Sequence, residues 1–168
     1  MMSLFETKSL KELAIGALFI AMILLMCFIS EPLGAAPADS VQVIAKHAEA
    51  DANSIYQIRF SATKPIPPKA MIRITFPPEF DLSEVMIAGS TTINGGFELK
   101  VDKQVVMLKR SGLGRPIPPN ESVDVKFAIV KNPRRAADDY RISVEILDEA
   151  EKTIIKRDEQ HKILPQQQ

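Results

Sequence analysis

The sequence is poor in the side chains that most often carry chemistry. Its 168 residues include one cysteine, two histidines and no tryptophan. The cysteine, Cys27, lies within an apolar N-terminal run, so the rest of the chain has neither a disulfide framework nor a thiolate. A blue-copper centre needs a cysteine together with two histidines, and a zinc site needs a comparable set of ligands. The sequence therefore excludes both, and we expect no cofactor.

The chain also lacks a net charge and a recognisable catalytic set. Its 21 basic residues balance 21 acidic ones, which gives no long-range field to attract a nucleic acid. The two histidines, His47 and His161, fall where we predict no strand. No serine sits on a strand-to-helix elbow, so a Ser-His-Asp arrangement has no support. We predict that the protein is not an enzyme and does not bind nucleic acid.

One long apolar run is present near the N-terminus, over residues 13–29. Lys8 and Lys11 precede it, and no further Lys or Arg occurs until Lys46. The positive-inside rule therefore places the N-terminus in the cytoplasm and the remainder outside. As a helix the run would be about 25 Å long, slightly short for a hydrocarbon core of about 30 Å. It is also slightly longer than the core of a signal peptide, which has about 7–15 residues.

Three interpretations of this run stay open. Ala36-Pro37-Ala38 offers small residues for signal-peptide cleavage before Asp39. Without cleavage the run is a transmembrane anchor, and lipidation at Cys27 is the third alternative. All three predict an extracytoplasmic domain, whether secreted, periplasmic or on the cell surface. In the uncleaved case residues 13–29 hold it in the cytoplasmic membrane.

A repeated proline motif dominates the rest of the chain. Lys64-Pro65-Ile66-Pro67-Pro68 and Arg115-Pro116-Ile117-Pro118-Pro119 each precede a run of alternating apolar residues that ends on phenylalanine. Such prolines could form a ligand for an aromatic groove. Since each motif leads directly into a strand pattern, we interpret both as rigid corners. We expect the two corners to lie near each other or in pseudo-symmetric positions.

Alternating apolar and polar residues predict a series of short strands. The expected strands are 41–44, 54–61, 71–76, 84–92, 97–101, 105–108, 123–129, 140–147 and 153–156. The inward sets are Tyr56, Ile58 and Phe60; Ile72, Ile74 and Phe76; Val123, Val125, Phe127 and Ile129; and Tyr140, Ile142, Val144 and Ile146.

This pattern predicts an all-β, immunoglobulin-like antiparallel β-sandwich preceded by one N-terminal hydrophobic helix. The expected organisation is a signal peptide or membrane anchor with its linker over residues 1–38, the sandwich over 39–157 and a polar C-terminal tail over 158–168.

Several motifs add a family resemblance. Ile74-Thr75-Phe76-Pro77 is followed by Phe80-Asp81, and Lys131-Asn132-Pro133 precedes a strand that runs from Tyr140 to Leu147-Asp148. In these features the chain resembles the immunoglobulin-like modules of bacterial and archaeal secreted and cell-surface proteins. The resemblance implies an extracytoplasmic sandwich without a shared catalytic activity.

Charged clusters supply the remaining candidate sites. Glu79, Asp81 and Glu84, and the pair Asp138-Asp139, are the only candidate calcium ligands, and neither group has the spacing of a known loop. Asn120-Glu121-Ser122 is a glycosylation sequon on an expected turn. Two basic loops combine Lys109-Arg110 with Arg115, and Lys131 with Arg134-Arg135. From these loops and the first corner we select a possible contact surface that comprises Lys64, Arg115, Lys131, Arg134 and Arg135.

The sequence thus predicts a non-enzymatic module that acts through protein–protein contact. It would be a structural module of the cell surface or envelope, or a membrane-tethered accessory subunit of a larger complex. The alternative is an adhesion module that binds a polysaccharide or Ca²⁺. Sugar-binding surfaces usually present exposed aromatic residues, whereas the two tyrosines, Tyr56 and Tyr140, fall on inward faces.

Overall fold

The computed structural model describes residues 38–166, and these residues form nine β-strands. The strands are β1 (Ser40–Ala45), β2 (Asn53–Ser61), β3 (Met71–Thr75), β4 (Ile87–Gly89), β5 (Phe97–Asp102), β6 (Val105–Arg110), β7 (Val123–Lys131), β8 (Ala137–Leu147) and β9 (Thr153–Ile163). The prolines among residues 38–166 lie outside the strands, as expected of residues that cannot donate to a sheet ladder.

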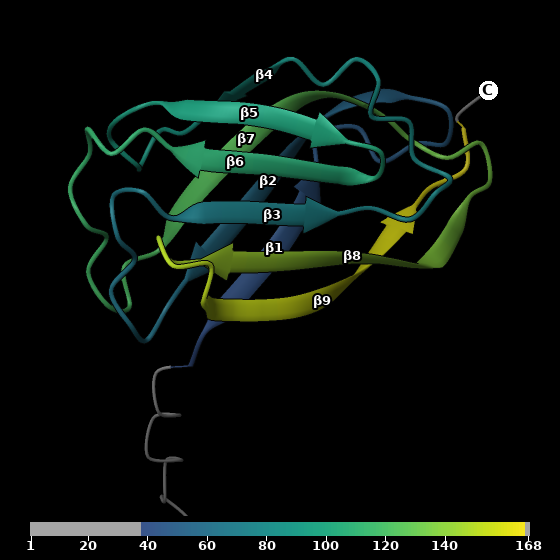
Figure 1. The fold of residues 1–168 in the computed structure, drawn as a ribbon. Coiled ribbons are helices and arrows are strands. Elements are labelled where there is room, and N and C mark those ends of the chain that lie inside the picture. Colours follow the sequence, from purple (N-terminus) through teal and green to yellow (C-terminus); the bar gives the residue numbers. More distant parts are fainter. Residues whose placement is uncertain (1–37, 167–168) are drawn as a thin grey trace, which may run out of the picture. The chain divides into compact units, whose positions relative to one another are not determined.

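Two antiparallel sheets form the sandwich. One sheet has the order β1-β2-β7-β4 and the other β5-β6-β3-β8-β9. Figure 1 shows the five-stranded sheet in front, with β2 and β7 crossing obliquely behind it. The predicted all-β sandwich is therefore confirmed. The predicted N-terminal helix falls in residues 1–37, outside the described part of the chain.

The core lies between the sheets and follows the predicted alternation. Tyr56, Ile58 and Phe60 of β2 are at most 1% exposed, and the inward residues of β3 and β8 are at most 4% exposed. An aromatic cluster fills one end of this core: the rings of Tyr56, Phe76, Phe80, Phe127 and Tyr140 stand mostly edge to face, with centroid separations of 5.2–6.2 Å. Aromatic pairs prefer such geometry, so the cluster gives this end a defined packing.

One inward residue was predicted wrongly. The pairing of β2 with β7 shifts register between Ser54 and Tyr56, so that Ala128 and Ile129 both lie opposite Ile55. Such a β-bulge adds one residue to one strand and reverses the alternation beyond it. Val130 therefore becomes the buried residue, and Ile129 is 41% exposed on the outer face.

The C-terminal boundary was also predicted wrongly. β9 continues to Ile163 and pairs with β8 along its length, so residues 158–163 belong to the sandwich rather than to a polar tail. Leu164 then exchanges backbone hydrogen bonds with the loop between β1 and β2, where Leu164 N–H donates to Ala48 O and Ala50 N–H donates to Leu164 O. These contacts close one end of the sandwich.

Within residues 38–166, no helix has the length and hydropathy needed to cross a membrane. The apolar run at 13–29 lies outside these residues, and its role as signal peptide or anchor stays a prediction.

Candidate functional site

The two proline corners meet at one end of the sandwich. Ile66 and Ile117 form an antiparallel bridge in which each N–H donates to the carbonyl of the other, at 3.0 and 2.9 Å. Both side chains are buried, at 1% and 5% exposure. The expected proximity of the corners is therefore confirmed, and Lys64 and Arg115 each lie two residues before a bridging isoleucine.

Arg110 joins the corners from within. Its Nη1 donates to Pro67 O at 2.7 Å and to Ile66 O at 3.4 Å, while Nη2 donates to Arg115 O at 2.7 Å. The residue is only 3% exposed, and burial lowers the pKa of its guanidinium. Gly114 is required beside it, because a Cβ there would lie 2.1 Å from Asn94 O. Arg110 is thus a structural clamp rather than part of a solvated basic loop.

The other three predicted contact residues lie at the opposite end. Lys131 Nζ and Arg134 Nε approach Asp51 Oδ1 at 3.2 and 3.6 Å, and Arg135 Nη2 approaches Asp139 Oδ1 at 3.7 Å. β7 runs the length of the sandwich between the two ends, from Val123 to Lys131, which is about 27 Å at 3.3–3.4 Å per residue. The fold therefore divides the five predicted contact residues between two ends and does not gather them into one surface.

A shallow groove of about 410 Å³ accompanies this second group. Lys131, Arg134 and Arg135 line it together with Asp51, Glu79 and Asp81, so cations and carboxylates are mixed within it. Asp81 accepts a hydrogen bond from Ser83 N–H at 2.9 Å, and this bond lowers the pKa of its carboxyl group. Within residues 38–166 no group of three or more His, Cys, Asp or Glu could hold a metal ion. The candidate calcium ligands named from the sequence are thus not assembled into a site there.

A buried polar network lies beneath the same end. Tyr56 Oη donates to Asn132 Oδ1 at 2.8 Å, and Asn132 Nδ2 donates to the carbonyls of His47 and Glu49 at 2.9 and 2.8 Å. Tyr56 Oη also lies 3.2 Å from His161 Nε2. Because the tyrosine proton is already donated to Asn132, Nε2 of His161 must carry a proton and donate to Tyr56. Burial raises the pKa of Tyr56 and lowers the pKa of His161, so it favours the neutral form of both groups.

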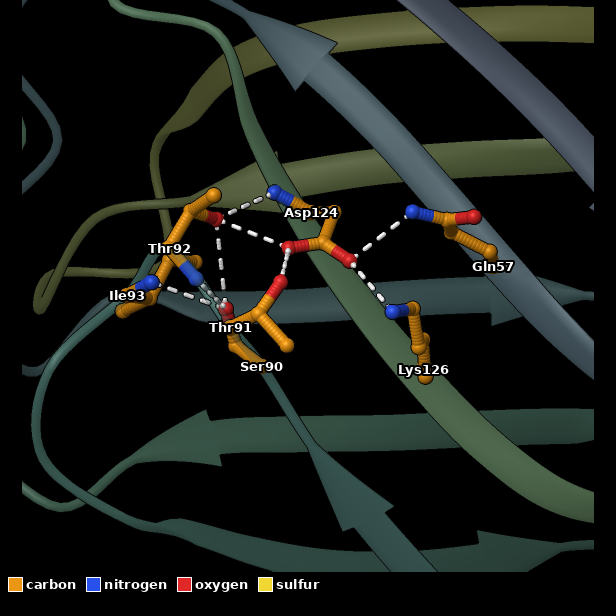
Figure 2. A network of polar contacts seen from close by, with 7 residues as sticks. All are labelled: Gln57, Ser90, Thr91, Thr92, Ile93, Asp124 and Lys126. Atoms are coloured by element: carbon orange, nitrogen blue, oxygen red, sulfur yellow. Dashed lines mark hydrogen bonds and ion pairs between the residues drawn. The ribbon is translucent and has the colours of Figure 1, made fainter.

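A second network anchors the loop after β4 to the outer face of β7 (Figure 2). Asp124 accepts hydrogen bonds from Thr92 Oγ1 at 2.8 Å, Thr91 Oγ1 at 3.1 Å and Gln57 Nε2 at 2.8 Å, and Lys126 Nζ lies 3.4 Å away. Burial alone would raise the pKa of Asp124, but the three hydrogen bonds and the lysine together lower it. Since every carboxylate oxygen has a partner, this network is a structural attachment.

The outer face of the four-stranded sheet carries an exposed apolar row. Ile44, Ile55, Ile129 and Ile87 come from β1, β2, β7 and β4, with 37%, 39%, 41% and 71% exposure. Ile55 lies opposite the β7 bulge that contains Ile129, and Ile87 pairs with Ala128. These residues therefore cross all four strands of the sheet. We call them the outer apolar row.

The outer face of the five-stranded sheet differs from this. Charged pairs cross this face, as in the Arg73–Glu145 ion pair at 3.1 Å between β3 and β8 and the Glu98–Lys109 pairing of β5 with β6, and the apolar Met71 and Met107 on it are partly buried. Exposed apolar residues that are contiguous across a sheet are characteristic of contact surfaces. The outer apolar row is therefore the strongest candidate for a functional surface.

Comparison with known proteins identifies the fold. The chain matches no protein-family model and no curated protein. Among solved structures, it is similar to the cohesin module of a family 33 glycoside hydrolase from Clostridium perfringens, with a TM-score of 0.52 at 14% identity over 77% of this chain and 97% of that module. At this identity the similarity shows the sandwich fold alone.

Two further solved structures show weaker similarity. A non-cellulosomal cohesin from Archaeoglobus fulgidus gives a TM-score of 0.42 at 14% identity, over 70% of this chain and 83% of that one. A Nocardia farcinica protein with an immunoglobulin-like fold gives 0.40 at 14% identity, over 68% of this chain and 80% of that one.

Sequence reasoning missed three of the residues that define these features. The sequence places Arg110 in a basic loop, His161 in a polar tail and Ile129 in the core. The alternating pattern that ends at Arg110 was the available signal for the first, since it places that residue on the inward side with Val106 and Leu108. Nothing in the local sequence marks the bulge that exposes Ile129.

Proposed function

We propose that this protein is a non-enzymatic, extracytoplasmic β-sandwich that acts through protein–protein contact. It serves as a structural module of the cell surface or envelope, or as a membrane-tethered accessory subunit of a larger complex. The observation that supports the contact role is the outer apolar row. The extracytoplasmic location rests on the apolar run at 13–29 and on the positive-inside rule.

The energetics favour a partner over exposure to water. Burying apolar surface stabilises a complex by about 25 cal/mol per Å², and a fully buried Ile or Met side chain contributes about 1.5–3 kcal/mol. The polar clusters of the domain offer less, because Asp124, Asn132 and Arg110 already have internal partners. The partner surface that suits the row is a largely apolar protein face.

A sugar-binding surface gains no comparable support. Tyr56 and Tyr140 are buried, at 0% and 4% exposure, and so are the phenylalanines of residues 38–166 other than Phe97, which is partly buried. The Glu79, Asp81 and Glu84 group forms no metal cluster within the described residues. We therefore favour protein contact over the polysaccharide- or Ca²⁺-binding alternative.

The test is to place a charge in the outer apolar row of the full chain in its native envelope. Ile55→Lys and Ile129→Lys should each remove the cross-linked adducts that the unaltered protein forms with its neighbours, because a buried unpaired lysine costs several kcal/mol at an apolar contact. The readout is cross-linking followed by mass spectrometry of the adducts.

The matched control is Leu113→Lys, because Leu113 is 89% exposed but lies outside the row, in the loop before the second corner. This variant should retain every adduct. Unchanged adducts in Ile55→Lys and Ile129→Lys, or their loss in Leu113→Lys, would contradict the proposed surface.

A further inference from the structure

β4 is a three-residue strand at one edge of the four-stranded sheet, and the segment around it lacks charges and prolines. The segment from Val85 to Thr92 contains no charged residue and no proline, and Met86 and Ile87 within it are 78% and 71% exposed. Natural sheet edges are normally protected by charges, prolines or covering loops. β5, an edge of the other sheet, follows this rule with Glu98, Lys100 and Asp102.

The backbone of β4 presents hydrogen-bonding groups at this edge. Met86 N–H donates to Ala128 O of β7 at 3.0 Å. Successive residues of a strand direct their N–H and C=O groups to opposite sides. The N–H and C=O groups of Ile87 and Gly89 therefore point away from β7, and those of Ala88 point toward it. The edge offers two donors and two acceptors that point outward.

We propose that β4 pairs in antiparallel register with β4 of a second copy of this chain, about a two-fold axis at Ala88. This inference rests on the proposed function and names a second contact, which the edge of the sheet makes beside the outer apolar row. In this register Ile87 lies opposite the partner's Gly89, and Gly89 lies opposite the partner's Ile87. Each pair exchanges two backbone hydrogen bonds, which gives four across the interface.

The side chains fit this register. A Cβ added at Gly89 would meet nothing within 4 Å, so the space beside it is open to the partner's Ile87. Ala88 is small, which suits the close approach of about 4.5 Å between Cα atoms at a pair that is not hydrogen-bonded. Two-fold pairing places identical segments together, and the absence of charge from Val85 to Thr92 avoids like-charge repulsion.

Pairing would also extend the outer apolar row. Ile87 lies on the same face as Ile129 and Ile55, and the two-fold axis would place the two Ile87 side chains diagonally across the junction. The result is one eight-stranded sheet with a continuous apolar row on its outer face. A short edge of this kind buries little area, so the dimer should be weak in dilute solution and strengthened wherever copies are concentrated.

A cysteine at the axis tests the proposal. In the full chain with Cys27→Ser, Ala88→Cys would be the only thiol, and the expected Cα separation is within the 4.4–6.8 Å range of a disulfide. Mild oxidation should yield at least about tenfold more covalent dimer than Leu113→Cys at the same protein concentration, because pairing raises the effective thiol concentration to about the millimolar range. Equal yields from both variants would overturn the proposal.

Two second-site variants test the register by independent routes. Ile87→Lys introduces a charge at the junction, and Gly89→Val fills the space that the partner's Ile87 needs. Each, combined with Ala88→Cys, should reduce the cross-link to the Leu113→Cys level. A cross-link that survives both changes would overturn the register. Failure of the dimer would leave the Ile55→Lys and Ile129→Lys result unaffected, so the two proposals are tested separately.

Discussion

Replacing Arg110 with alanine is expected to lower the free energy of unfolding by about 4 kcal/mol. Each hydrogen bond from a charged group contributes about 1.5–3 kcal/mol, and Arg110 makes two at 2.7 Å and a weaker one at 3.4 Å. The substitution also leaves Arg115 O without its guanidinium donor in a partly buried position. Because these bonds join the two proline corners, the loss should unfold the whole domain at a lower urea concentration.

Matched variants test whether the loss of stability comes from the paired N–H donors of the Arg110 guanidinium or from the loss of its charge and volume. Arg110→Lys retains the charge but cannot reach both Pro67 O and Arg115 O, so it should recover less than half of the loss. Arg59→Ala removes an exposed arginine from β2 and should cost less than about 0.5 kcal/mol. Urea unfolding followed by circular dichroism measures all three. Similar midpoints for Arg110→Ala and Arg59→Ala would show that the corners do not depend on this clamp.

Acidification is expected to destabilise the fold through His161. Burial lowers the pKa of this histidine below its ordinary 6.5, so the unfolded chain binds a proton in a pH range where the folded chain does not. Stability is therefore fully present above pH 6.5. It should fall by up to about 1.4 kcal/mol per pH unit between 6.5 and the lower folded pKa.

The pH range and two variants identify the group responsible. Asp124 and Asp81 have pKa values lowered from 3.8, so their stabilising contributions are lost only at more acidic pH. His161→Gln should flatten the dependence just below pH 6.5, whereas His47→Gln, which alters an exposed side chain, should preserve it. Thermal unfolding across this range is the measurement. A dependence that persists in His161→Gln would assign the effect to another group.

The strands that face the core on one side were predictable because their alternation is strong. β2, β3 and β8 carry uninterrupted inward sets such as Tyr56, Ile58 and Phe60, and turn residues bound them. The proline corners were predictable for a similar reason, since a fixed φ and a following strand leave few arrangements. The mutual bridge of Ile66 and Ile117 confirmed that they lie together.

The errors occurred where local sequence does not decide the conformation. The bulge opposite Ile55 depends on how β2 meets β7, and it moved Ile129 from the expected core to the outer face. β9 was predicted too short because residues 156–160 are Lys-Arg-Asp-Glu-Gln, a polar run typical of a solvated tail. As a sheet edge, this strand tolerates such residues between its two core contacts, which are Ile155 near its start and His161 and Ile163 at its end.

The outer apolar row could not be predicted because its members come from four separate strands. Ile44, Ile55, Ile87 and Ile129 are each unremarkable in sequence, and isolated exposed apolar residues are normal. Only the order β1-β2-β7-β4 brings them onto one face. The contact residues chosen from sequence were instead cations, and the fold separates these between its two ends.

Oxidation of Met86 is the most direct test of the claim that the exposed apolar surface around β4, next to the outer apolar row, is covered in the native envelope. Met86 is 78% exposed in the single chain, whereas Met71 and Met107, on the outer face of the other sheet, are partly buried and serve as internal references. The measurement is sulfoxide formation at each methionine after brief peroxide treatment, read by mass spectrometry of peptides from the full chain. Met86 should oxidise fastest in dilute purified protein and become protected, relative to Met71 and Met107, in the intact envelope. Equal oxidation of Met86 in both settings would contradict the account.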